Sequence, residues 1–214
     1  MREFIGANWL VLVPIVVLSI AALAVIIERG AYFYRIRDRR GSSLQDALFR
    51  LGRASSTLVM DSFDDGDASP ARVLLEEALQ PQAVNTPGLF KQRMEALRDR
   101  HIDRMERHLP ILPGIGNVAT LMGLFGTVSG MITAFSRMTE TGNSDPYVLA
   151  GGISRALVTT AAGLAVAIPA LAAHHLFEAV IDRHCDRMDD VLTECLAKNG
   201  AAYARKREQK NTSA

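Results

Sequence analysis

Three long windows without a charged residue constrain this chain more than any other feature of its sequence. Trp9–Ile27, Ile111–Phe135 and Ala156–Phe177 contain none of its 24 Lys and Arg or 23 Asp and Glu residues. Each window approaches or exceeds the roughly 20 residues that a helix needs to cross a bilayer. The sequence therefore predicts an all-α, polytopic membrane protein with three transmembrane helices. It excludes a soluble single-core enzyme, a disulfide-stapled secreted domain and, at a net charge of +1, a strongly basic nucleic-acid binder.

The positions of the basic residues predict the orientation of the chain. Lys and Arg gather between the first two windows and after the third, and basic residues favour the cytoplasmic side of a membrane. Because the arginines follow the first window, we expect a retained span and no cleaved secretory signal. We expect a periplasmic N-terminus at 1–8, spans at 9–27, 109–136 and 156–177, a cytoplasmic helical loop at 28–108, a periplasmic loop at 137–155, and a cytoplasmic helix and tail at 178–214.

Two apolar seams outside the windows predict long helices that extend into the cytoplasm. Apolar residues at helical spacing precede the second window, at Phe90, Met94, Leu97, His101, Met105 and Leu109. A second seam follows the third window, at Ile181, His184 or Cys185, Met188, Val191, Leu192 and Cys195. No helix breaker separates this seam from Phe177, so we expect one long helix. Its partner is either the 89–109 helix of the same chain or a neighbouring subunit.

Small and hydroxyl residues recur on one side of the second and third windows, whereas the first window is generic and predicts a lipid-facing helix. Small faces let helices approach closely, and two interpretations follow. Either the threonines bond to carbonyls of their own helix and the stripes only pack, or the facing stripes line a narrow passage with Thr127 and Thr160. The stripes are Gly116, Thr120, Gly123, Thr127, Gly130 and Ala134, and Ala156, Thr160, Gly163, Ala167, Ala170 and His174.

No span contains an Asp, Glu, Lys or Arg residue. Proton pathways through membranes normally include a titratable group, and a threonine hydroxyl can only hydrogen-bond. If the chain conducts protons, the carboxylate must come from another polypeptide. His174, at the predicted cytoplasmic end of the third span, is either a proton exit or a polar anchor of the helix end. No zinc-type cluster, nucleophile–base pair or phosphate-binding loop is present, so we expect no metal, no cofactor and no enzymatic activity.

Two segments of the second and third windows and their flanks match known sequence signatures. Leu124–Met131 resembles the pattern G-L-x-G-T-V-x-G, and Ile153–Ala170 resembles the pattern I-S-E-A-L-x-x-T-A-x-G-L…A-I-P-A. These patterns are the second-span and third-span signatures of the ExbB/TolQ/MotA proton-channel family, and the chain resembles its ExbB branch most of all. The order of the segments and the predicted topology agree with this family. Arg155 is a departure, since family members often carry Glu there. It would lie at the outer interface, pair with a partner carboxylate or oppose proton entry.

The resemblance implies a homo-oligomer in the bacterial inner membrane, a pentamer in ExbB-like proteins. Its second and third helices would surround the single spans of an ExbD-like partner, whose aspartate supplies the missing carboxylate. Proton flow would then drive a TonB-like protein that energises outer-membrane transport. TolQ-like envelope maintenance, a motility motor and a non-conducting scaffold are the alternatives. We expect a proton pathway at Thr127, Thr160, Thr120 and Thr159, helix packing around the pore at Gly123, Gly126, Gly130, Gly163 and Pro169, and an interface or gating role for Arg155 and His174.

Overall fold

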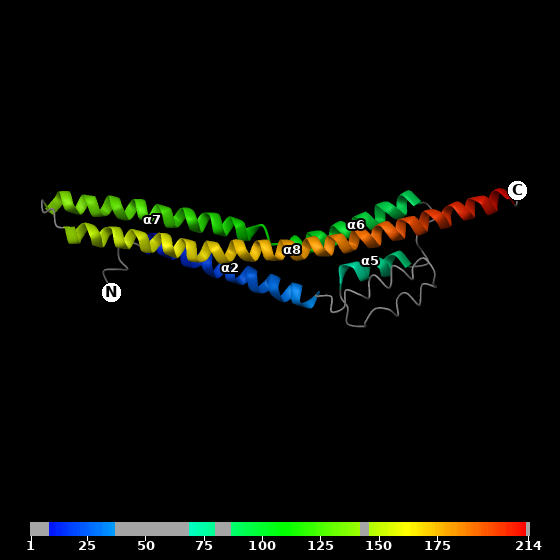
Figure 1. Ribbon diagram of the computed structural model, residues 1–214, viewed down its shortest axis with the longest axis horizontal. Coiled ribbons are helices and arrows are strands. Elements are labelled where there is room, and N and C mark those ends of the chain that lie inside the picture. Colours follow the sequence, from blue (N-terminus) through cyan, green and yellow to red (C-terminus); the bar gives the residue numbers. More distant parts are fainter. Residues whose placement is uncertain (1–8, 37–68, 80–86, 142–145, 213–214) are drawn as a thin grey trace. The chain divides into compact units, whose positions relative to one another are not determined.

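The computed structural model describes residues 9–36, 69–79, 87–141 and 146–212, and within these ranges the chain is helical and contains no strand. The all-α prediction is therefore confirmed. Residues 1–8, 37–68 and 80–86, which include the predicted N-terminus and much of the predicted cytoplasmic loop, lie outside the described residues. The helices are α2 (Trp9–Arg35), α5 (Pro70–Leu79), α6 (Pro87–Glu106), α7 (Ile111–Thr141) and α8 (Pro146–Thr212) (Figure 1).

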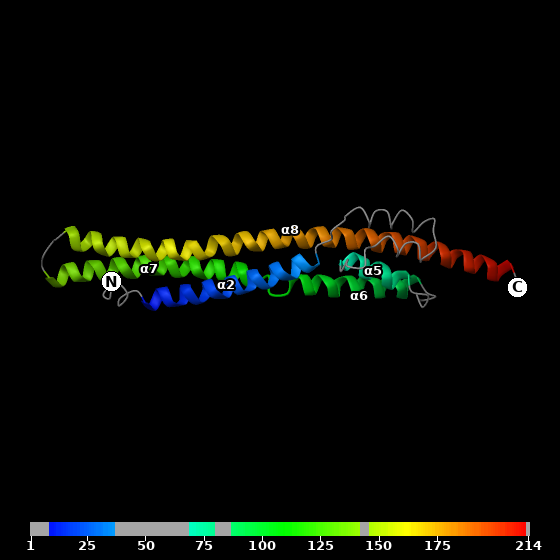
Figure 2. The same cartoon turned by 90° about the horizontal axis from the view of Figure 1, so that it is seen from below.

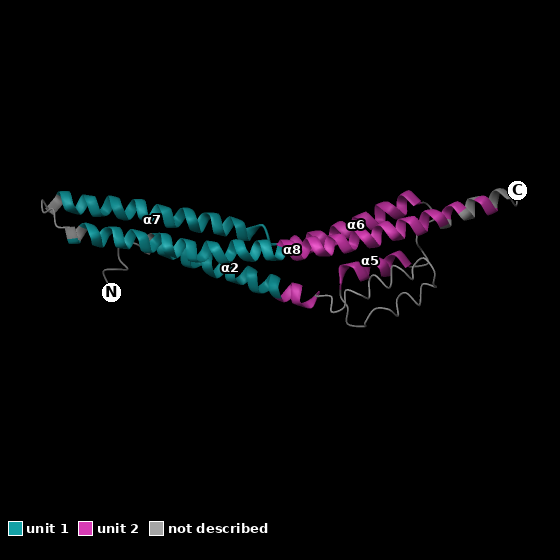
Figure 3. Cartoon of the chain, viewed as in Figure 1, with its two compact units in different colours: residues 1–30, 108–177 teal, residues 31–107, 178–214 magenta. Residues whose placement is uncertain are grey.

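The chain divides into two compact units, which are coloured separately in Figure 3. Unit 1 comprises residues 1–30 and 108–177, and unit 2 comprises residues 31–107 and 178–214. The helix α8 runs without interruption through both, as the absence of a breaker after Phe177 predicts. Helices α2, α7 and α8 each contain a stretch that is long and apolar enough to cross a membrane. The three charge-free windows are thus three membrane-spanning candidates.

The predicted periplasmic loop is largely helical. α7 continues to Thr141 and α8 begins at Pro146, so only residues 142–145 separate the two helices. Pro146 suits the first position of a helix because its fixed φ angle is helical and the amide it lacks would have no partner there. Charge patterning alone could not reveal these helical extensions, since it marks only where the apolar stretches end.

In unit 1, α2 runs alongside α7 and the first part of α8 (Figures 1 and 2). One face of α2 is buried at Val11, Ile15, Ala22 and Arg29, which recur at helical spacing. The other faces are exposed, with Ile20 64% accessible. The expectation of a purely lipid-facing first helix is therefore wrong for one of its faces, which packs inside the unit.

The helix α6 ends at Glu106, whereas the apolar seam that predicted this helix continues to Leu109. His108 has a φ of 64°, in the left-handed region, and Pro110 lacks the amide that an unbroken helix would use. The imidazole Nδ1 of His108 lies 3.3 Å from both carboxylate oxygens of Glu28 in α2, within unit 1. A turn thus separates α6 from α7, which begins at Ile111.

In unit 2, the continuation of α8 buries an apolar seam against elements of the same chain. The buried positions recur at spacings of three and four residues, at Ile181, His184, Met188, Val191 and Cys195. The geometry therefore selects His184 rather than Cys185 at the ambiguous position. Arg98 of α6 donates two hydrogen bonds to the Asp189 carboxylate of α8, at 2.5 and 2.9 Å. The α6 helix of the same chain is thus one partner of the seam, the first of the two predicted alternatives.

The two cysteines of this segment are free thiols. Burial raises the pKa of Cys195 to about 11 and also raises the pKa of the half-buried Cys185. Both thiols therefore stay protonated at neutral pH, and the thiolate that would attack a disulfide or bind a metal is scarce.

The Arg98–Asp189 pair provides a test of how α6 is held to α8. A double-mutant cycle with Arg98→Ala and Asp189→Ala should give a coupling energy of about 1 kcal/mol, because the pair is bidentate but half exposed at Asp189. The exposed ion pair of Lys91 and Glu95, at 3.6 Å within α6, is the matched control and should couple by about 0.5 kcal/mol or less. Thermal melting of the four variants in each cycle measures both values, and equal couplings would contradict the assignment.

Candidate functional site

The candidate site is built on a close contact between α7 and α8 in unit 1. A Cβ atom added to Gly163 would lie 2.5 Å from the carbonyl oxygen of Ala119 and 3.1 Å from the Cα of Gly123. A Cβ on Gly123 would lie 3.1 Å from the Cα of Thr160. Backbone atoms cannot rotate away as side-chain atoms can, so a Cβ at either position would require the two helices to shift apart, and by more at Gly163 than at Gly123.

The same contact extends along both helices, with small residues on each side. Gly126 lies against the Thr159 side chain, and Gly130 lies against Ala156. We call this surface the α7–α8 seam. It consists of Gly116, Ala119, Gly123, Gly126, Gly130 and Ala134 of α7 and Gly152, Ala156, Thr159, Thr160, Gly163, Ala167 and Leu171 of α8. Small residues allow two helix backbones to approach this closely inside a membrane.

The seam shares most of its residues with the predicted stripes, but it does not include two of their threonines, Thr120 and Thr127. Ala119 and Gly126 take the places that the predicted stripe gave to Thr120 and Thr127. Thr120 is exposed and Thr127 is half-buried, whereas Thr159 is fully buried. The sequence signal for Ala119 was present but weak, since it is one more small residue in a window rich in them.

The four predicted pathway threonines differ in their hydrogen bonds. Thr120, Thr127 and Thr159 donate to carbonyl oxygens three or four residues earlier on their own helix, at 2.9, 2.6 and 2.7 Å. Thr160 instead donates across the seam to the carbonyl oxygen of Gly123, at 3.0 Å. The local bonds agree with the packing interpretation. Thr160 alone among these four ties the two helices together.

Within one chain, the seam leaves no room for a passage between the stripes at Gly123 and Gly163, because the two backbones are in contact there. Several bulky residues of both helices are exposed, whereas Leu171 lies in the seam against Gly116. Leu121 and Ile132 of α7 and Leu157 and Ile168 of α8 are each more than 60% exposed. The assignment of Thr127 and Thr160 to a pore between several chains therefore stays a prediction.

The other predicted site residues lie at the edges of this arrangement. Pro169 lies inside α8 with an exposed side chain, so it does not contribute to the seam. The side chains of Arg155 and His174 are half-buried. The imidazole of His174 lies 5.3 Å from that of His175, measured between ring centroids.

Comparison with known proteins identifies the family. Residues 67–190 match the MotA/TolQ/ExbB proton channel family, and this match spans more than half of the chain. The chain belongs to this family. Its similarity to the MotA/TolQ/ExbB proteins, expected from the two signatures, is thereby confirmed. The matched residues include α5, α6, α7 and most of α8, so the entire α7–α8 seam lies inside the family region.

Individual members of the MotA/TolQ/ExbB family support this result. Biopolymer transport protein ExbB-like 3 of Synechocystis is 30% identical over 176 residues, which cover 81% of this chain and 83% of that protein. ExbB of Salmonella typhimurium is 27% identical over 199 residues, with coverage of 87% and 79%. TolQ of Pseudomonas aeruginosa is 33% identical over 109 residues, with coverage of 51% and 46%. The chain is thus a membrane protein of a transport-type family and not a member of a known enzyme class.

Proposed function

We propose that this chain is an ExbB-like proton-channel subunit of an inner-membrane motor. An ExbD-like partner supplies the proton-binding aspartate, and the motor delivers mechanical work through a TonB-like protein to outer-membrane transport. One observation carries the proposal: a member of a proton channel family has no Asp, Glu, Lys or Arg in any of its three charge-free windows, and the histidines of these windows, His174 and His175, lie at the end of the third. A conducting pathway needs such a group, so a second polypeptide has to bring it.

The close packing of α7 and α8 supports a pathway between chains rather than through one chain. Since the seam is filled, a proton would travel along a surface of the α7–α8 pair that faces a partner. In this proposal the chains form a pentamer with the N-terminus in the periplasm and the C-terminus in the cytoplasm. Thr127 and Thr160 then contribute the pore hydroxyls, and Arg155 lies near the periplasmic entrance.

The relatives favour an ExbB role over a TolQ role. ExbB of Salmonella typhimurium aligns with 87% of this chain, whereas TolQ of Pseudomonas aeruginosa aligns with 51%. A shared channel region explains similarity to both, and the longer alignment extends it outside that region. We therefore place nutrient uptake ahead of envelope maintenance as the process that the motor drives.

Deletion of the gene tests this proposal in the organism. The deletion should abolish energy-dependent uptake across the outer membrane and leave resistance to detergents at the wild-type level. The intact chain should restore uptake, and so should the control variant Thr133→Val, whose exposed hydroxyl on α7 bonds only to the carbonyl oxygen of Ser129. Detergent sensitivity with normal uptake would instead establish the TolQ-like role. A deletion strain that shows neither defect would contradict a motor function.

A further inference from the structure

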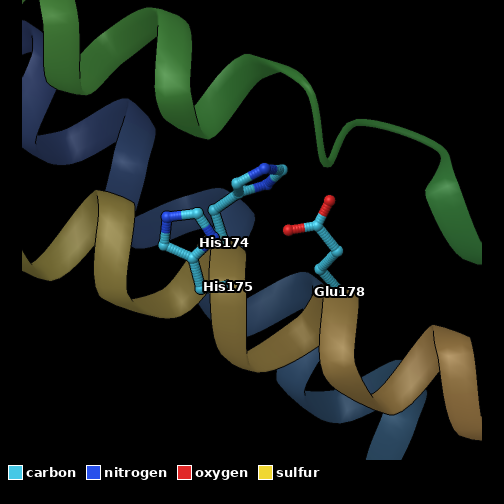
Figure 4. Close-up of side chains that lie close together, drawn as sticks. All are labelled: His174, His175 and Glu178. Carbon is cyan, nitrogen blue, oxygen red and sulfur yellow. The ribbon is translucent and has the colours of Figure 1, made fainter.

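Two histidines and a glutamate lie together on consecutive turns of α8 (Figure 4). Each of His174, His175 and Glu178 offers one ligand atom, and these three atoms lie within 4.8 Å of one another. We propose that these side chains form a binding site for a divalent transition metal of the zinc class. This site is independent of the proposed channel function.

The geometry of one helix brings these side chains together. Glu178 follows His174 by four residues and His175 by three, which are the two separations that place helical residues side by side. α8 is uninterrupted through this stretch, so the arrangement depends on no other element. Figure 4 shows the carboxylate of Glu178 and the ring of His174 projecting on the same side of the helix, with the ring of His175 beside that of His174.

The distances are compatible with a shared metal ion. Zinc bonds of about 2.0–2.1 Å in a tetrahedral site place neighbouring ligand atoms roughly 3.3 Å apart. The three ligand atoms already lie within 4.8 Å of one another. Each atom therefore has to move by only part of the difference between this separation and the roughly 3.3 Å of a tetrahedral zinc site. Glu178 is exposed and has three side-chain torsions, which lets its carboxylate make most of this movement.

The ligand chemistry selects the metal. Two imidazoles and one carboxylate form a set that binds zinc in proteins and leaves the fourth position to water. Calcium and magnesium prefer oxygen ligands, so the two nitrogens disfavour them. His175 and Glu178 are exposed, which gives a hydrated ion direct access. The cysteines nearest in sequence compete poorly because burial keeps Cys185 and Cys195 protonated.

Zinc titration of the purified full-length chain in detergent tests the proposal. With a chromophoric chelator as competitor at about pH 7.5, we expect one saturable Zn²⁺ per chain. Glu178→Gln and His175→Asn, both at exposed positions, should each weaken binding roughly tenfold or more.

Two matched variants separate this site from nonspecific binding. Glu194→Gln removes an exposed carboxylate elsewhere on α8, and His101→Asn removes a half-buried imidazole on α6. Both should bind Zn²⁺ as the unmodified chain does. Failure of the unmodified chain to bind Zn²⁺ saturably would overturn the proposal. Unchanged affinity in both Glu178→Gln and His175→Asn would also overturn it, and melting curves verify that each variant is folded.

Discussion

Replacing Gly163 by Val lowers the melting temperature of the purified protein by about 5 °C or more. The new Cβ would lie 2.5 Å from the backbone oxygen of Ala119 and 3.1 Å from the Cα of Gly123. Since neither is the end of a flexible side chain, α7 and α8 have to separate. Overpacking of this kind typically costs 1–3 kcal/mol, and the two extra methyl groups of Val add to it.

The matched control is the same substitution at Gly151, which also lies in α8. A Cβ at that position meets nothing within 4 Å. Gly151→Val should leave the melting temperature within about 1 °C of the unmodified protein, because valine is no worse than glycine in a helix interior. Equal losses for the two variants would contradict close packing at Gly163 as the cause of the destabilisation.

Replacing Thr160 by Val reduces partner-dependent proton flux to the background level while the assembled complex persists. Valine has nearly the same shape as threonine but no hydroxyl, so it can neither hydrogen-bond a proton carrier nor reach the carbonyl oxygen of Gly123, now 3.0 Å from the hydroxyl. Hydrogen bonds between membrane helices contribute on average about 0.6 kcal/mol, which is too little to unfold the protein. The loss therefore appears in flux and not in stability.

Thr127→Val is the companion variant, because the Thr127 hydroxyl donates to the carbonyl oxygen of Leu124 on its own helix and to no other residue in the described part of the chain. It should also reduce flux, whereas Thr133→Val should not. Flux in vesicles that contain both subunits measures all three, and size-exclusion chromatography checks that the complexes are intact. Unmodified flux in both Thr127→Val and Thr160→Val would refute the assignment of the pore hydroxyls and leave the family assignment in place.

The membrane helices and the long α8 helix were predictable because a lipid environment excludes charged residues from the spans and leaves them in the flanking segments. Charge is excluded from the spans, and the amphipathic seam after Phe177 contains no breaker. The buried face of α2 gave no such contrast, since Val, Ile, Leu and Ala occupy all sides of that helix. The turn at His108 escaped prediction for the opposite reason, because apolar spacing continued through it to Leu109.

The sequence predicted the contact face of α7 to within one residue position, since it gave Thr120 and Thr127 where the structure has Ala119 and Gly126. A stripe of small residues marks a face about 100° wide, so Thr120 and Ala119 fit the same pattern. Only the packing of the two helices decides between them, and it buries Ala119 and exposes Thr120. The grouping of His174 with Glu178 was missed because the predicted end of the third span, at residue 177, separated them. The proposed subunit number and partner carboxylate depend on other chains, which the sequence of one chain does not describe.

Proton flux into vesicles tests the central claim, that the carboxylate of the pathway is supplied by another polypeptide. Vesicles would contain this chain alone, this chain with its ExbD-like partner, or this chain with a partner whose membrane aspartate is replaced by asparagine. We predict flux only with the unmodified partner. Flux through this chain alone, or undiminished flux with the asparagine partner, would contradict the account.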